Sequence, residues 1–305
     1  MNFILNNKKM IIFISKFYKT QKMSEFLDEL AEKGYCVIED VLSEEEIAIA
    51  KNDFYNWLES HEQIKKIHNT ISPHCIFKHF EVGNQRHAWF IRTREKVQEP
   101  FRKIWNTDEL VCSLDGSCWR PKELKKKDNI WTHTDQAPSK KGLRCIQGFV
   151  ALTDNITSSL VVYEGSHKLH EKYATDYNLT STKDWLLIEH EYLEKIASTK
   201  KILPVKAGSL VLWDSRTFHQ NLYGCNEERI VQYVCFLPRK NMTSKMQEKR
   251  IKYFQEARTT SHWPYPVKVN GLQPQTYGNK DLIINYHELK KPDLDDLMPN
   301  IVKIL

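Results

Sequence analysis

The sequence predicts a mainly β protein with helical additions, and three observations lead to that prediction. The chain has 305 residues, of which 41% are hydrophobic and 28% charged, a composition typical of a folded globular protein rather than a disordered or coiled-coil one. Helical periodicity dominates the first hundred residues, whereas short apolar runs rich in Val, Ile, Tyr, Trp and Phe follow one another from Leu110 onward. Such runs, many of them separated by Gly or Asp/Asn, are typical of a β-sandwich or barrel.

The first 22 residues differ from the rest of the chain. Lys8 and Lys9 precede only five apolar residues, 10–14, which are too few for the core of a signal peptide or for a membrane span. A better helix opens at Met23. We therefore expect residues 1–22 to be a disordered extension or the result of a misplaced start, and we expect no membrane span.

Helices are expected on the N-terminal side of the β region. Ser24 can cap a short helix that stops at Gly34, and residues 35–38 then have the pattern of a strand. Ser43 and Glu46 have the spacing of a capping box. They precede apolar residues at helical spacing, namely Ile47, Ala50, Phe54, Trp57 and Leu58. A further helical pattern, 97–105, contains a proline, which disfavours a helix interior.

The apolar runs of the β region predict at least seven strands. They are 110–114, 131–133, 143–152, 160–163, 202–205, 209–213 and 230–236. A helical insertion is expected at about 184–197 and a further helix over 243–258. Because no repeat or linker is evident, we expect a single domain over 23–260 with its β core at about 110–240. The Pro-rich remainder, 261–305, is expected to be an irregular tail that packs on this domain.

Charge and cysteine content restrict the function classes. The net charge is +6, and the densest basic run, 122–127, is interrupted by Glu123 and Leu124. A solvated loop is the simpler interpretation, because nucleic-acid binding requires basic residues gathered on one surface. The seven cysteines include no CxxC pair. This pattern disfavours a zinc knuckle or a disulfide framework and indicates a reducing, cytoplasmic location.

Four residues of the β region could carry chemistry: His133, Asp135, His219 and Arg229. His133 and Asp135 are two residues apart at a strand end, so both side chains leave the same face and can reach one ion. A second imidazole, from His219, would complete a facial set of two histidines and one carboxylate, which is typical of Fe(II) oxygenases. The spacing alone is weak evidence, because His79 and Glu81 have it as well.

Arg229 begins the strand that follows His219, and Gly224 lies in the loop between them. In strand alternation Arg229 shares a face with Val231 and Tyr233, so its guanidinium lies on a largely apolar wall and requires an anionic partner. A carboxylate bound by two parallel hydrogen bonds is one possibility. An ion pair with Glu227 or Asp214 is the other.

The stretches around these residues resemble the phytanoyl-CoA dioxygenase-like family of Fe(II)/2-oxoglutarate oxygenases. The matching stretches are 131–136, 149–154, 159–167, 208–219 and 229–239, and 35–47 resembles the family's N-terminal strand and helix. Two positions depart from the family pattern. Glu164 stands where proline is more usual, and Ser158-Ser159 stands where the family more often has Asn-Gly. These changes concern the shape of loops.

The resemblance implies a double-stranded β-helix, a jelly-roll or cupin-like core with a metal at one mouth. It implies that His133, Asp135 and His219 are the catalytic ligands of Fe(II), and that Arg229 binds the distal carboxylate of the co-substrate 2-oxoglutarate. The implied reaction consumes dioxygen, hydroxylates a small-molecule or acyl substrate and releases succinate and CO2.

The resemblance extends to two further positions and to the type of reaction. Asn221 and Phe149 match positions that contact 2-oxoglutarate in relatives. Because related halogenases lack the carboxylate at the position of Asp135, hydroxylation is favoured over halogenation.

Two alternatives stay open: the same chemistry on a nucleic acid or a protein side chain, and a metal-binding barrel without catalytic activity. The substrate is expected to depend on loops outside the metal ligands. The aromatic stretch 262–266 is either a lid or, as favoured, packing on the outside of the barrel.

Overall fold

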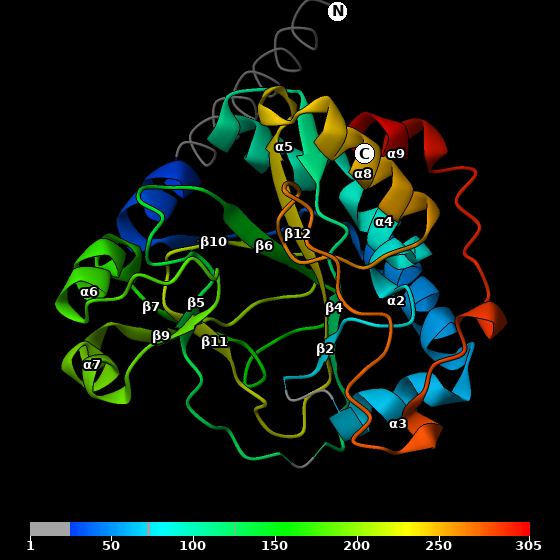
Figure 1. Ribbon diagram of the computed structural model, residues 1–305, viewed down its shortest axis with the longest axis horizontal. Helices are drawn as coiled ribbons and strands as arrows, with labels where there is room; N and C mark the ends of the chain where they lie inside the picture. The colour runs from blue at the N-terminus through cyan, green and yellow to red at the C-terminus, as the bar shows by residue number, and fades with distance from the viewer. Residues whose placement is uncertain (1–24, 72–73, 125) are drawn as a thin grey trace, which may run out of the picture.

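The core of the protein consists of two antiparallel sheets (Figure 1), in a computed structural model that describes residues 25–71, 74–124 and 126–305. The large sheet contains, in spatial order, β1 (Tyr35–Ile38), β10 (Leu210–Asp214), β6 (Ile146–Ala151), β12 (Arg229–Pro238), β4 (Ser117–Arg120) and β2 (Ile76–Phe77), and β3 (Leu110–Cys112) pairs with β12. The small sheet contains β8 (Leu186–Leu187), β5 (His133–Thr134), β11 (His219–Asn221), β7 (Leu160–Tyr163) and β9 (Lys200–Ile202). This architecture is a double-stranded β-helix, so the predicted fold class is confirmed.

The central strands of the large sheet are buried on both faces. On β10, Leu210 and Leu212 pack into the hydrophobic cluster that includes the helices, whereas Val211 and Trp213 belong to a separate cluster between the two sheets. Successive side chains of a strand point to opposite faces. Both faces therefore need apolar residues, which explains why these strands appear in the sequence as continuous apolar runs.

Helices cover the outer face of the large sheet, and two further helices flank the small sheet (Figure 1). The first group contains α2 (Glu44–Glu59), α3 (Glu62–Ile71), α4 (Arg86–Arg92), α5 (Glu95–Trp105), α8 (Ser244–Gln255) and α9 (Met298–Ile304). The second contains α6 (His170–Asp176) and α7 (His190–Lys195). Residues 25–33 are also helical. Within the described ranges, no helix has the length and apolarity needed to cross a bilayer.

The start of α2 shows how local sequence sets an element. Ser43 Oγ accepts a hydrogen bond from the backbone N–H of Glu46 at 3.2 Å, and the Glu46 carboxylate accepts one from the Ser43 N–H at 2.9 Å. The predicted capping box is thus confirmed. It orients the helix so that Ala50, Phe54 and Trp57 are buried against the core.

Several elements differ from the sequence-based expectation. The helical insertion expected at about 184–197 consists of a two-residue strand, β8, followed by the short helix α7. Strand β4 and helices α6 and α9 were not anticipated, because each is too short for periodicity to be evident. The α5 helix forms despite Pro100 in its interior. The expected extension, residues 1–22, lies outside the described residues.

Candidate metal centre

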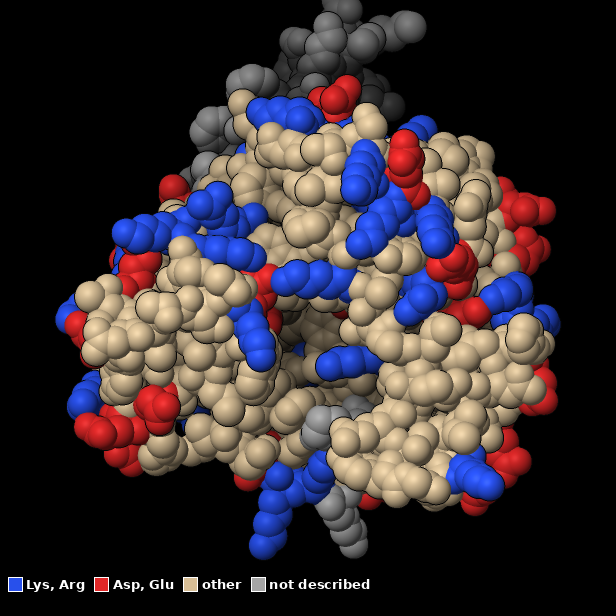
Figure 2. All heavy atoms as spheres, viewed as in Figure 1, with Lys and Arg blue, Asp and Glu red and all other residues tan. Residues whose placement is uncertain are grey.

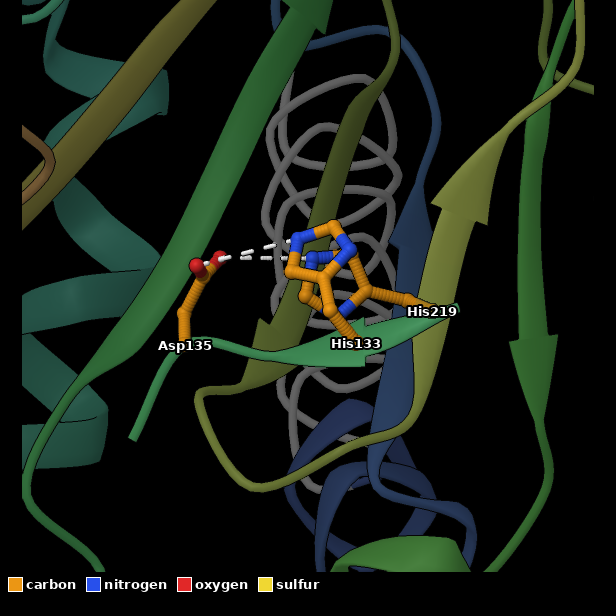
Figure 3. A group of neighbouring side chains, drawn as sticks. All are labelled: His133, Asp135 and His219. Atoms are coloured by element: carbon orange, nitrogen blue, oxygen red, sulfur yellow. Dashed lines mark ion pairs between the residues drawn. The ribbon is translucent and has the colours of Figure 1, made fainter. Parts of the chain in front are cut away.

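Two neighbouring strands of the small sheet place three candidate ligands together (Figure 3). His133 on β5 and His219 on β11 are direct partners in the antiparallel register, so their imidazoles leave the same face, with ring centroids 4.4 Å apart. Asp135 follows just beyond the end of β5, where its backbone N–H donates to the carbonyl of Ser215 at 3.0 Å. Strand alternation gives Asp135 the same direction as His133.

The three ligand atoms have the spacing of a metal site. Asp135 Oδ1 lies 3.7 Å from His133 Nε2, and Asp135 Oδ2 lies 3.3 Å from His219 Nε2. All three residues can present one ligand atom within 4.8 Å of the others. Ligands bound about 2.1 Å from one ion lie roughly 3 Å apart when they are adjacent. The distances are therefore close to those of a coordination shell.

The hydrogen bonds of the two histidines leave their lone pairs directed at the centre. His133 Nδ1 donates to the carbonyl of Trp131 at 3.1 Å, and His219 Nδ1 donates to the carbonyl of Thr217 at 2.8 Å. A carbonyl can only accept, so Nδ1 carries the proton and Nε2 is free to bind a metal in both residues. Asp135 Oδ2 accepts from Gln147 Nε2 at 3.0 Å. Such outer contacts orient metal ligands.

The electrostatics favour the protonation states that a metal requires. Burial, together with the neighbouring His219, lowers the pKa of His133 to about 3. Burial acts to raise the pKa of Asp135, but His133 and His219 outweigh it and hold that pKa well below its usual range. At neutral pH the site therefore offers a neutral imidazole beside an ionised carboxylate.

The second His-x-acid pair of the sequence does not form such a site. His79 Nδ1 donates to the carbonyl of Gly271 at 3.2 Å, and Glu81 forms an ion pair with Lys291. Within the described ranges, His133, Asp135 and His219 are the group that could hold a metal ion. Tertiary context thus separates two patterns that are equivalent in sequence.

Arg229 is buried, with 1% of its surface exposed, and lacks a carboxylate partner among the described residues. Its Nε donates to Asn155 Oδ1 at 3.0 Å, and its guanidinium lies 5.2 Å from the ring centre of Phe149. Nη2 is buried without a hydrogen-bond partner in the described part of the chain. A buried guanidinium with a free N–H requires an acceptor, so this position can bind an anion.

The two acids considered as partners of Arg229 are engaged elsewhere. Asp214 forms an ion pair with Arg216 at 2.7 Å. The Glu227 carboxylate accepts hydrogen bonds from three successive backbone N–H groups, those of residues 156–158. The structure therefore does not support the ion-pair alternative for Arg229.

Asn221 and Phe149 meet around Tyr233, which the sequence analysis did not select as a site residue. Asn221 Nδ2 donates to the Tyr233 hydroxyl at 3.2 Å, and its Oδ1 has no partner among the described residues. Phe149 pairs in register with Tyr233, and the two rings make an edge contact at 6.4 Å. Asn221 and Tyr233 line the cavity beside the three ligands, whereas Arg229 and Phe149 are not among its lining residues.

A cavity of about 220 Å³ contains the three candidate ligands. Figure 2 shows a hollow at the centre of this face, with Lys and Arg side chains around its edge. Besides the residues named above, the lining includes His74, Lys78, Asp115, Trp131, Gln147, Trp185, Trp213, Ser261, His262 and Asn270. The sequence analysis placed none of these ten at the site. Most of them converge from segments far apart in the chain, whereas Trp131 and Gln147 lie two residues from His133 and Phe149. For 262–266, where packing outside the barrel was favoured, the structure places His262 at the cavity.

The chain has clear similarities to known proteins. Residues 30–221 match the family described as "Phytanoyl-CoA dioxygenase (PhyH)". "Ava biosynthesis cluster protein O" of Aspergillus versicolor is 26% identical over 275 residues, which cover 82% of this chain and 89% of that protein.

Two solved structures share the fold. The epimerase SnoN, in complex with Fe3+, alpha-ketoglutarate and nogalamycin RO, is similar with a TM-score of 0.50 and 16% identity over 72% of this chain and 84% of its own. EvdMO1 is similar with a TM-score of 0.50 and 14% identity over 71% of this chain and 50% of its own.

Proposed function

The chain belongs to the phytanoyl-CoA dioxygenase family, and we propose that it is a non-haem oxygenase that uses Fe(II), 2-oxoglutarate and dioxygen to hydroxylate a small molecule. The observation that carries this proposal is the convergence of His133, Asp135 and His219 in one cavity, with both imidazole Nε2 atoms free to bind an ion. Two imidazoles and one carboxylate leave further coordination positions open for a co-substrate and dioxygen.

The residues present fit the implied metal and co-substrate. His133 and His219 would supply Nε2 lone pairs, and Asp135 would supply a carboxylate oxygen while Gln147 fixes its orientation. With these groups bound, the site would supply the oxidation of 2-oxoglutarate to succinate and CO2, coupled to insertion of one oxygen atom into the substrate. Related halogenases lack the carboxylate at the position of Asp135. Its presence here supports hydroxylation over halogenation.

Arg229 is proposed to bind the carboxylate of 2-oxoglutarate that is remote from the metal. Its unpartnered Nη2 supports this role, because a carboxylate would complete the hydrogen bonds of a buried guanidinium. The Phe149 ring packs against the guanidinium, 5.2 Å from its centre. Asn221 is proposed to act through Tyr233: its Nδ2 donates to the Tyr233 hydroxyl, and that hydroxyl can donate its own hydrogen to a co-substrate oxygen.

A metabolite comparison tests the activity. A small-molecule extract is incubated with Fe(II), 2-oxoglutarate and dioxygen, together with wild type, Asp135→Ala or Asp176→Ala. Asp176 is the matched control, because it pairs with Lys172 on the surface of α6. We expect wild type and Asp176→Ala to produce succinate and a compound heavier by one oxygen atom, and Asp135→Ala to produce neither. Equal products from wild type and Asp135→Ala would sink the proposal.

The small-molecule substrate class can be separated from the alternatives in the same assay. Mixed-sequence oligonucleotides or a peptide library replace the extract, and succinate release is measured at increasing salt concentration. Succinate release that is stimulated by oligonucleotides, and less so as the salt concentration rises, would indicate a nucleic-acid substrate instead.

Two further expectations stay predictions from the sequence. One is a single domain over 23–260 with the tail packed on it, and the other is a cytoplasmic location.

A further inference from the structure

One wall of the cavity is built by two segments that are far apart in the chain. Thr260 donates its backbone N–H to the carbonyl of Leu114 at 2.8 Å and accepts from the Leu114 N–H through Oγ1 at 3.2 Å. An antiparallel bridge between Thr260 and Val269 closes the loop that runs from one of these residues to the other. These contacts place the loop next to Asp115. Asp115, Ser261, His262 and Asn270, here called the polar wall, all line the cavity.

The loop of the polar wall is also tied to another side of the cavity. Lys268 forms an ion pair with Asp184, which also pairs with Lys140. Asp184 directly precedes Trp185, a further lining residue. Ser261, His262 and Asn270 lie beyond residues 30–221, the part of the chain that matches the family. The polar wall is therefore held in place firmly and is built largely by a segment outside the family match.

Polar groups of this wall lack partners within the described ranges. Ser261 Oγ and His262 Nε2 are both buried there without a hydrogen bond. Asp115 Oδ1 accepts from the adjoining Gly116 N–H at 2.8 Å, and no Lys or Arg among the described residues forms an ion pair with this carboxyl. Buried polar groups are almost always hydrogen-bonded. Two unsatisfied atoms beside the Asp115 carboxyl thus indicate a polar ligand.

Two aromatic lining residues indicate the chemistry of the rest of that ligand. Trp131 stacks on His74 with ring centroids 3.7 Å apart, and Trp185 is 49% exposed. Both indoles line the same cavity as the polar wall. Flat aromatic surfaces favour contact with a ring or another planar group. They also favour a cation over their faces.

We propose that the polar wall recognises the substrate, and that it binds a hydrogen-bond donor, an ammonium or a hydroxyl, carried on a ring-containing body. This inference rests on the proposed oxygenase function. Asp115 is the acceptor, while Ser261 and His262 complete the hydrogen bonds of the same polar group. A plain hydrocarbon chain would leave Ser261 Oγ and His262 Nε2 unsatisfied. A carboxylate ligand has no N–H or O–H to donate to the Asp115 oxygens.

Four matched probes test the inference on the full chain loaded with Fe(II) and 2-oxoglutarate without oxygen. They are 2-phenylethylamine, 2-phenylethanol, the methyl ether of 2-phenylethanol, which accepts but cannot donate, and 3-phenylpropionate. Binding is measured by ligand-observed NMR. We expect the amine or the alcohol to bind at least tenfold more tightly than the ether and the carboxylate, and the tighter of the two identifies the donor.

Substitutions in the polar wall test whether it causes the preference for probes that carry a hydrogen-bond donor. Asp115→Leu, which removes the acceptor, is expected to abolish the preference for the donor, and Asp115→Asn, which keeps one acceptor oxygen, to weaken binding of the amine. Ser261→Ala is expected to weaken binding of the donor without a change in charge. Asp176→Asn, the same substitution on the surface of α6, is expected to leave it intact. Equal binding of the ether or the carboxylate, no binding of any probe, or an unchanged preference in Asp115→Leu would overturn the inference.

The proposed function and this inference fail in different ways. Asp115→Asn is expected to retain the visible absorbance of the Fe(II)–2-oxoglutarate chelate, which also shows that the variant is folded. Absence of that absorbance from wild type would contradict the oxygenase function. Its presence in all variants, together with probe binding that does not depend on Asp115, would contradict only the assignment of the polar wall.

Discussion

His133 and His219 lie directly opposite each other in the register of β5 and β11, so two residues 86 positions apart present their imidazoles to one point. This relationship follows from the antiparallel pairing of two very short strands. Each ring is then fixed by a hydrogen bond from Nδ1 to a backbone carbonyl two residues earlier in the chain. The sheet itself, rather than a flexible loop, thus orients both nitrogen ligands.

Removing the outer contact of Asp135 should weaken metal binding without removing a ligand. Gln147→Leu eliminates the hydrogen bond to Asp135 Oδ2, and losses of this kind reduce metal affinity by about 10- to 100-fold. Titration with Fe(II) or Co(II) measures the change. Gln255→Leu, at the exposed end of α8, is the matched control. Unchanged affinity in Gln147→Leu would show that Asp135 is oriented by other contacts.

Substitution of Arg229 should act on the co-substrate and not on the metal. Arg229→Met removes a charged donor, whose hydrogen bonds contribute about 1.5–3 kcal/mol each. We expect the affinity for 2-oxoglutarate to fall roughly 10- to 100-fold, with metal affinity preserved. Titration of the metal-loaded protein with 2-oxoglutarate checks this, with Arg144→Met on the surface as control. If both variants bind 2-oxoglutarate equally, the role of Arg229 is structural.

His133, Asp135, His219 and Arg229 were predictable from the sequence, because the position of each follows from the local pattern of strands and loops. A strand end places His133 and Asp135 on one face, and a loop after His219 leads into the strand that begins with Arg229. Gln147 and Tyr233 were not selected, although each shares a strand with a residue that was. Their roles depend on which strands are neighbours, and strand order is not evident from any single segment.

The polar wall was beyond sequence reasoning for a different reason. Thr260 binds Leu114 across 146 positions, and no periodicity or composition indicates that contact. His262 therefore belonged, in sequence, to a tail expected to pack outside the barrel. Short elements such as β4 and α6 were missed because two to seven residues are too few to establish a period.

The capping box of α2 provides a test of local stability. Ser43→Ala removes the acceptor for the Glu46 N–H at the start of the helix, and loss of such a cap costs about 1 kcal/mol. We expect the free energy of unfolding, measured with urea, to fall by about that amount. Ser139→Ala, at an exposed turn position, is the control. A midpoint equal to that of wild type would mean that tertiary packing alone fixes this helix end.

The raised pKa of Asp115 predicts how the stability of the protein depends on pH. Burial raises the pKa of Asp115 to about 7 in the folded protein, whereas an unfolded aspartate titrates near 3.9. The folded state therefore holds the proton more tightly, and its stability relative to Asp115→Asn is greatest below about pH 4 and declines as pH rises to about 7. Urea unfolding of both proteins at several pH values measures this difference. A difference that is constant from pH 4 to 8 would contradict the assigned environment of Asp115.

Anaerobic titration of the protein with Fe(II) and 2-oxoglutarate tests the metal centre most directly. The account predicts that wild type develops the weak visible absorbance of a metal–2-oxo acid chelate, saturating at one equivalent of each. His190→Ala, on the exposed face of α7, should retain this absorbance, and His219→Ala should lose it. No absorbance in wild type, or undiminished absorbance in His219→Ala, would contradict the assignment of His133, Asp135 and His219 as the iron ligands.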